Sequence, residues 1–147
     1  MLWLQFGERR AAPTVRGPDR VVGEFALHVQ CPWRIAAASG VITGRSDIYI
    51  PVDPEVDEDD YPWDKPGSSI VDRQLRRWIE AHARDPLRVV DIVVDRCAGF
   101  RLSFANACSF EVFPDAFSMP HDIREHWRLL QPAAETPHFV VTNQGWG

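Results

Sequence analysis

The sequence predicts an α+β fold in which a curved, mainly antiparallel sheet of about six strands packs on one principal helix. Apolar residues occupy every second position from Phe25 to Ile35, which is the pattern of a strand with one face in a core and one in water. Val71, Leu75 and Trp78 recur at helical spacing. The regular alternation of strands and helices found in doubly wound nucleotide-binding folds is absent.

Length and composition favour a single soluble domain over residues 1–147. The chain has 147 residues, of which 45% are hydrophobic and 25% charged, as in ordinary globular domains. Its first charges follow a brief apolar stretch, which is the reverse of a secretory signal, and no apolar run reaches the ~18 residues of a membrane span. The three cysteines form no C-x-x-C pair. We therefore expect a cytoplasmic protein that does not associate with membranes.

The first half of the chain predicts strands joined by polar connections. Residues 2–6 form a short strand candidate, and residues 8–18 form a polar connection that contains proline and glycine. The long alternating strand covers about residues 22–37. Pro32 predicts a bend or bulge in it, because proline cannot donate a hydrogen bond to a neighbouring strand. Residues 41–50 would return antiparallel, with an interruption near residues 43–44.

A long loop and the principal helix follow. Residues 51–67 contain four prolines and many acidic residues, so we expect a surface loop there, and long loops in compact domains are often functional. The sequence Ser69-Ile70-Val71-Asp72 is a variant of the capping box and predicts the start of the helix. Asp85-Pro86 predicts its end.

The second half predicts a three-stranded meander and a last strand. Residues 87–96, 99–105 and 107–113 form the meander, because the last two segments alternate around a tight turn. Residues 121–130 are short and mixed, and we expect one or two helical turns there. Residues 138–142 form the last apolar strand.

The leading functional hypothesis rests on the acidic loop at residues 51–67. Seven of the 21 acidic residues lie between Asp53 and Asp64 with no basic residue among them, and two aromatic residues lie within this run. Aromatic side chains beside charges are common anchors of protein interfaces. We therefore expect a non-enzymatic binding protein, of immunity or regulatory type, that docks a basic partner. The alternative is a solvated surface loop that has no binding role. The predicted contact residues are Asp57, Glu58, Asp59, Asp60, Tyr61 and Trp63.

Neither of two candidate metal sites has the pattern that a metal requires, so no metal or cofactor is predicted. The spacing of the acidic loop resembles a calcium loop, but Glu58 occupies the position of the required glycine and Pro54 constrains the backbone. The densest ligand-type cluster does not form the H-E-x-x-H arrangement, and its two i, i+4 pairs would point about 100° apart on a helix. This cluster consists of His121, Asp122, Glu125 and His126.

The alternative hypothesis is a small-ligand-binding protein or an enzyme that uses the polar face of the curved sheet. His28, Gln30 and Arg34 share the polar phase of the long strand, and His28 could act as an acid or base. If this face is solvated, the three residues are ordinary solvent-facing side chains of the sheet and form no binding site. Cys97 lacks any signature of a nucleophile. No phosphate-binding or dinucleotide motif and no basic stripe is present, so nucleic-acid binding is not expected.

Four segments carry a resemblance to a known family: GEFALHVQCPWRI at 23–35, EVFPD at 111–115, EHWRLLQP at 125–132 and HFVV at 138–141. They resemble a family of uncharacterised single-domain bacterial proteins. The resemblance spans most of the chain outside the acidic loop. It implies a one-domain bacterial protein and no particular activity or catalytic residue.

Overall fold

The polypeptide forms two compact units, each built around an antiparallel sheet. The computed structural model describes residues 1–14, 17–57, 61–62, 65–83, 87–115 and 121–147. One unit contains residues 1–31 and 114–147, and the other contains residues 32–113. Each unit has a five-stranded sheet, and the second also has an α-helix. The α+β class is confirmed, but the expected single curved sheet of about six strands is wrong.

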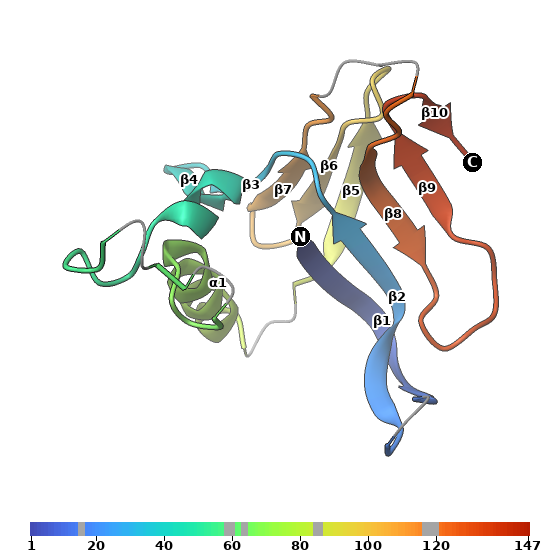
Figure 1. The fold of residues 1–147 in the computed structure, drawn as a ribbon, viewed down its shortest axis with the longest axis horizontal. Helices are drawn as coiled ribbons and strands as arrows, with labels where there is room; N and C mark the ends of the chain where they lie inside the picture. Colours follow the sequence, from blue (N-terminus) through green and yellow to red (C-terminus); the bar gives the residue numbers. More distant parts are fainter. Residues whose placement is uncertain (15–16, 58–60, 63–64, 84–86, 116–120) are drawn as a thin grey trace. The chain divides into compact units, whose positions relative to one another are not determined.

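The first unit brings together strands from both ends of the chain (Figure 1). A long two-stranded ribbon of β1 and β2 continues into β8, so β2 has a neighbour on both sides. Sequence order places this third strand about a hundred residues from the second, a separation that no local pattern can reveal. In spatial order the sheet contains β1 (Leu2–Ala12), β2 (Arg20–Val29), β8 (Glu125–Leu130), β9 (Phe139–Thr142) and β10 (Gly145–Trp146).

Strand β1 is longer than the expected residues 2–6, because a glycine bulge lets it continue. The pairing with β2 shifts register between Phe6 and Arg9. Gly7 lies within this shift at φ +80°, and a Cβ atom there would come 2.9 Å from the Cβ of Glu24. Glycine is the residue that adopts this conformation without steric cost. Residues 9–12, expected in a connection, therefore pair with β2 instead.

The expected break at Pro32 is the point where the chain passes from one sheet to the other. Strand β2 ends at Val29, and β3 (Trp33–Ala37) belongs to the second unit. The backbone N–H groups of Gln30 and Cys31 both donate to the carbonyl oxygen of His126, at 2.8 and 3.2 Å. The apolar alternation runs on through the break, so the sequence shows one long strand where the structure has two.

The second unit contains the expected meander. Its sheet has a buried face on which Trp33, Ile35 and Phe110 are 4%, 1% and 1% exposed. The Trp33 and Phe110 rings lie 6.0 Å apart, within the range of favourable aromatic pairs. In spatial order the strands are β4 (Gly40–Gly44), β3, β7 (Ser109–Val112), β6 (Phe100–Phe104) and β5 (Val89–Val94).

Helix α1 (Ile70–Ala81) begins where its capping residue predicts. The Ser69 hydroxyl accepts a hydrogen bond from the Asp72 N–H at 3.2 Å, and the buried Trp78 ring packs against Phe104 at 5.7 Å. The expected return strand over residues 41–50 ends earlier than predicted, because the 3-10 helix η1 (Arg45–Tyr49) follows β4. No helix in the part of the chain that the structure describes combines the length and hydropathy needed to cross a membrane.

The expected helical turns at residues 121–130 are wrong, because this segment contains strand β8. The apolar Trp127 and Leu129 alternate with the charged Arg128, and β2 and β9 provide hydrogen-bonding partners on both sides. A short segment of this kind takes its structure from its neighbours, which override local propensity.

Candidate functional site

A row of side chains crosses one face of the first sheet. Trp3 on β1 is paired with His28 on β2, which in turn is paired with Arg128 on β8. Directly paired residues project to the same face, so the three side chains are neighbours. The Trp3 and His28 rings stack with centroids 4.1 Å apart and planes 12° apart. Trp3 is 58% exposed, so this row offers an aromatic surface to solvent.

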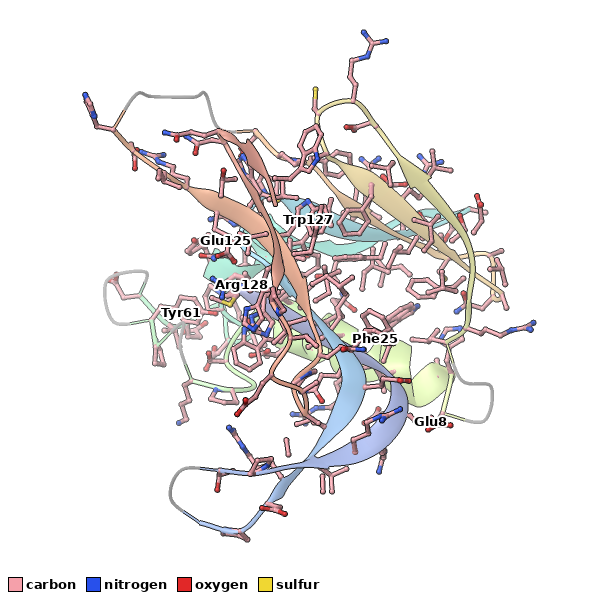
Figure 2. All side chains as sticks on the ribbon, turned by 90° about the vertical axis from the view of Figure 1, so that its right-hand side faces the viewer. Glu8, Phe25, Tyr61, Glu125, Trp127 and Arg128 are labelled. Atoms are coloured by element: carbon pink, nitrogen blue, oxygen red, sulfur yellow. The ribbon has the colours of Figure 1, made fainter. Side chains whose placement is uncertain are left out.

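A bulge in β8 places Glu125 beside Arg128. Residues three apart in a regular strand point to opposite faces, but the register shift between Glu125 and Trp127 changes this. The Arg128 Nε–H donates to Glu125 Oε1 at 2.7 Å, and Nη2 donates to Oε2, which makes the pair bidentate. Both residues lie on β8 (Figure 2). No sequence pattern predicts this pair, because the bulge has no local signature.

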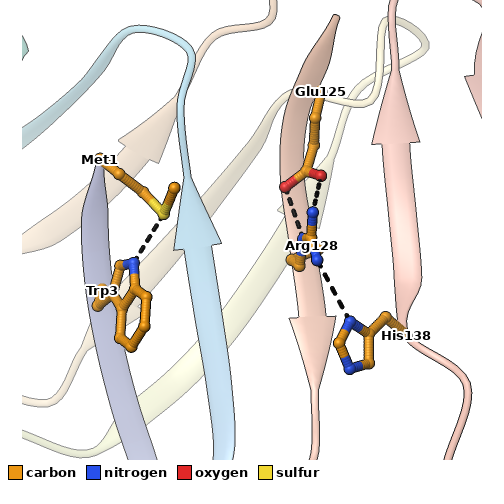
Figure 3. Close-up of polar contacts among 5 residues, drawn as sticks. All are labelled: Met1, Trp3, Glu125, Arg128 and His138. Carbon is orange, nitrogen blue, oxygen red and sulfur yellow. Dashed lines mark hydrogen bonds and ion pairs between the residues drawn. The ribbon is translucent and has the colours of Figure 1, made fainter.

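The row extends through Arg128 to a second histidine. Arg128 Nη1 lies 3.4 Å from His138 Nδ1 (Figure 3). On the other side, the Trp3 indole N–H donates to the Met1 sulfur at 2.7 Å. We call this group the polar face cluster; it consists of Trp3, His28, Gln30, Glu125, Arg128 and His138.

The pKa values in the polar face cluster follow from its charges. Burial lowers the pKa of His28 below its ordinary 6.5, the charges of Arg128 and His138 lower it further, and the charge of Glu125 partly opposes them. The Arg128 hydrogen bond lowers the pKa of Glu125 against the effect of burial, and a hydrogen bond from Gln30 adds to it. His28 is therefore neutral at pH 7, with one ring nitrogen able to accept a hydrogen bond.

The three predicted ligand residues are divided between the two units. His28 and Gln30 belong to the polar face cluster, whereas Arg34 lies on β3 in the other unit. Arg34 Nε donates to Glu111 Oε2 at 2.7 Å, and its guanidinium lies 5.0 Å from the Phe113 ring centroid. The sequence pattern predicts one strand that carries all three residues. In the structure, β2 ends at Val29, before Pro32, and Arg34 lies on the next strand, β3.

Glu111 is the centre of a separate ion network in the second unit. Its side chain is 8% exposed, accepts hydrogen bonds from Arg34 and from Ser109 at 3.1 Å, and forms an ion pair with Arg101 at 3.0 Å. Burial raises the pKa of Glu111, but these hydrogen bonds and positive charges lower it overall. Arg101 and Glu111 also line a cavity of about 280 Å³. Since both carboxylate oxygens are occupied by protein donors, this network supports the sheet.

The acidic loop is closed at its base by backbone contacts. Pro51 forms a bridge with Ser69, the Val52 N–H donates to Ser68 O at 2.8 Å, and the Ile70 N–H donates to Ile50 O at 2.8 Å. The two ends of the loop therefore lie side by side, which is the defining property of an Ω-loop.

The structure describes two of the six predicted contact residues. Tyr61 is half-buried, and its hydroxyl donates to Ile48 O at 3.0 Å, so it fastens the loop to the unit that carries it. Tyr61 and Val56 line a hollow of about 230 Å³. Asp57 is exposed. The other predicted residues lie outside the described residues: Glu58, Asp59, Asp60 and Trp63.

Residues 121–126 do not gather around a common point. Asp122 pairs with Arg124 at 2.6 Å, Glu125 pairs with Arg128, and His126 is 4% exposed within the bulge. Within the described ranges, no three histidine, cysteine or acidic side chains are placed to hold a metal ion.

Family models, curated proteins and solved structures gave no match to this chain. The functional inference therefore rests on the two surfaces described above, the acidic loop and the polar face cluster.

Proposed function

We propose that the chain is a non-enzymatic binding protein, of immunity or regulatory type, that docks a basic protein through its acidic loop. The observation that carries this proposal is the closed base of the loop at Pro51 and Ser69. A loop with a fixed base presents its charges at lower entropic cost than an open one, because less backbone freedom is lost on binding.

The charge of the loop indicates the kind of partner. Asp53, Glu55 and Asp57 are exposed, and Lys65 is the single basic residue of residues 51–67. A concentrated negative charge attracts a basic surface over roughly 10 Å at moderate salt and raises the association rate. Specificity would come from the shape of the loop, which Tyr61 maintains through its bond to Ile48.

Neutralisation of the loop tests this proposal. The test variant carries Asp53→Asn, Glu55→Gln and Asp57→Asn. The control variant carries Asp19→Asn, Glu80→Gln and Glu135→Gln, which remove the same charge from other exposed positions. Each is used for affinity capture from a bacterial lysate at low and high salt. We expect a basic protein on the wild type and the control, released by salt and at least about tenfold depleted on the test variant.

Two results would contradict the proposal. Equal capture by the test variant would show that the loop charges are not recognised. Equal loss from the test and control variants would show that only the net charge of −5 matters.

A second candidate function is the binding of a small polar ligand at the polar face cluster. The specific observation is that the stacked Trp3 and His28 rings lie in one row with Arg128. Flat rings and a neutral imidazole can stack on, and hydrogen-bond to, a ligand with a polar ring.

Binding of defined probes separates this second function from the first. We would add nucleosides, sugars and free amino acids at millimolar concentration and follow the Trp3 indole and His28 ring signals by NMR. A ligand should shift both signals in the wild type and in the acidic-loop variant, and it should leave the remaining Trp3 signal unshifted in His28→Gln. Unchanged signals with all probes would argue against the ligand function.

A further inference from the structure

Strand β5 is an apolar edge strand whose side chains are exposed on both faces. It pairs with β6 and ends the spatial order of the second sheet. Ile92 and Val93 point to opposite faces, yet they are 60% and 57% exposed. All six residues of the strand are exposed, and Asp91 is the single charged residue among them. Long apolar edges of this kind pair readily with another strand.

The open edge of β5 presents unpaired backbone groups. The Asp95 N–H donates to Gly99 O at 2.9 Å, which points it toward the β6 side of the hairpin. Backbone groups alternate in direction along a strand, so Val94 and Ile92 direct their N–H and C=O groups away from β6. These groups are positioned to form hydrogen bonds with an added strand.

Two of the other sheet edges in the described chain, those at β1 and β4, have protection beyond a single bulge. Strand β1 has a bulge at Gly7 followed by the charged residues 8–10. Strand β4 leads directly into η1 and contacts α1. Bulges, charges and covering helices are the usual means of blocking an edge. Strand β5 has a single irregularity, between Val89 and Asp91.

We propose that β5 pairs antiparallel with β5 of a second copy of this chain, around a two-fold axis. The sequence Val-Val-Asp-Ile-Val-Val contains a single charge, so the strand can pair with its own copy in a register that opposes no like charges within β5. In an antiparallel pair the two strands run in opposite directions, so the valines near one end of β5 lie opposite the valines near the other end of the second copy's β5. The two sheets then continue as one across the dimer.

The charge of Asp91 selects the register. A two-fold axis centred on Asp91 would place the two carboxylates directly opposite each other, which is unfavourable. An axis centred on Ile92 avoids this, because each Asp91 then faces Val93 of the second copy and each Val90 faces Val94. In this register the two Ile92 residues exchange both of their outward hydrogen bonds.

The expected dimer is weak and concentration-dependent. One pair of six-residue strands buries less than the ~1,600 Å² of a standard protein interface. Light scattering and sedimentation equilibrium on the full chain, up to about 1 mM and with reductant to keep Cys97 reduced, measure the association. Kd values near 1 mM correspond to weak but measurable complexes. The wild type should change from monomer to dimer over this range.

Two lysine substitutions at exposed edge positions form a matched pair. Ile92→Lys in β5 should weaken the dimer at least about tenfold, because it places two ammonium groups opposite each other at the axis. Val41→Lys in β4, which is 62% exposed, should leave it unchanged. Circular dichroism would confirm that both variants are folded. Ile92→Pro removes an outward N–H group and should also abolish the dimer.

Each remaining outcome overturns the proposal. A wild type that stays monomeric at 1 mM shows that β5 does not pair with itself. A dimer that survives both Ile92 substitutions uses another surface. Equal weakening by Val41→Lys assigns the effect to charge, and open-ended oligomers exclude a closed two-fold contact.

Discussion

At the scale of single residues, the pKa of His28 reports the arrangement of the polar face cluster. Arg128→Gln removes a positive charge that lowers this pKa, so the pKa should rise toward 6.5. Glu125→Gln removes the charge that raises it, so the pKa should fall. NMR titration of the His28 ring measures both. Shifts in the same direction would show that the three residues do not interact as described.

The same histidine makes stability depend on pH. Because the pKa of His28 is lower in the folded protein than in the unfolded chain, the unfolded chain binds the proton more readily. The free energy of unfolding should therefore fall as pH decreases through 6.5 toward the folded pKa. His28→Gln should reduce this loss between pH 7.5 and 5.5 in urea titrations. An identical pH dependence in the variant would contradict the assignment.

Glu111 adds a second loss of stability on acidification, at lower pH than that of His28. Its pKa is lower in the folded protein than its ordinary 4.5, so its contribution is complete above 4.5 and is lost as pH falls through the folded pKa. Glu111→Gln should cost about 1–3 kcal/mol at pH 7, near the low end because Arg34 and Arg101 are partly exposed. The variant should also lose less stability on acidification. Unfolding titrations from pH 7 to 3 provide the comparison.

The sequence pattern predicts part of the arrangement of these polar residues. The alternation around Phe25 puts His28 and Gln30 in one polar phase, and in the structure both side chains interact with Glu125. The same alternation also grouped Arg34 with these two residues, because the apolar pattern continues through Pro32 whereas β2 ends at Val29. The pairing of Glu125 with Arg128 depends on a bulge, and a bulge is created by how two distant strands align.

At the scale of elements, the start of α1 depends on one hydroxyl group. Ser69→Ala removes the acceptor for the Asp72 N–H and should reduce the free energy of unfolding by about 1 kcal/mol. Ser69→Thr keeps a hydroxyl and should cost less. Thermal and urea unfolding measure the difference. Equal losses in the two variants would indicate that packing of the buried Ser69, rather than capping, is the cause.

The length of β1 depends in the same way on Gly7. Gly7→Ala forces a side chain into φ +80° and into the 2.9 Å approach to Glu24, so a loss of about 1–2 kcal/mol is expected. Gly147→Ala has open space around it and should be neutral. Hydrogen exchange should show the largest loss of protection at residues 8–12. Unchanged protection there would mean that the bulge tolerates a side chain.

At the scale of the whole molecule, the sequence predicted the class but not the number of sheets. Local patterns located the helix, the meander and the last strand. They could not show that β8 inserts between β2 and β9, because that arrangement joins segments about a hundred residues apart. Residues 121–130 were assigned helical turns for the same reason, since their partners lie elsewhere in the chain.

Whether the two units unfold together is a prediction about the whole chain. The chain passes between them twice, at residues 31–32 and 113–114, and the Phe113 N–H donates to Pro32 O at 2.9 Å. The first unit is built from both ends of the chain, so closing its sheet while residues 32–113 are unfolded carries the closure entropy of a long loop. We therefore expect one cooperative unfolding transition, as in most domains under about 150 residues.

Probes placed in each unit test this expectation. Urea unfolding is followed by NMR through the Trp3 indole signal in the first unit and the Trp33 signal in the second. Coincident midpoints are expected, and Glu111→Gln in the second unit should then lower both midpoints equally. A variant that shifts the Trp33 midpoint alone would show that the units unfold separately. The single-domain prediction for residues 1–147 would then be wrong.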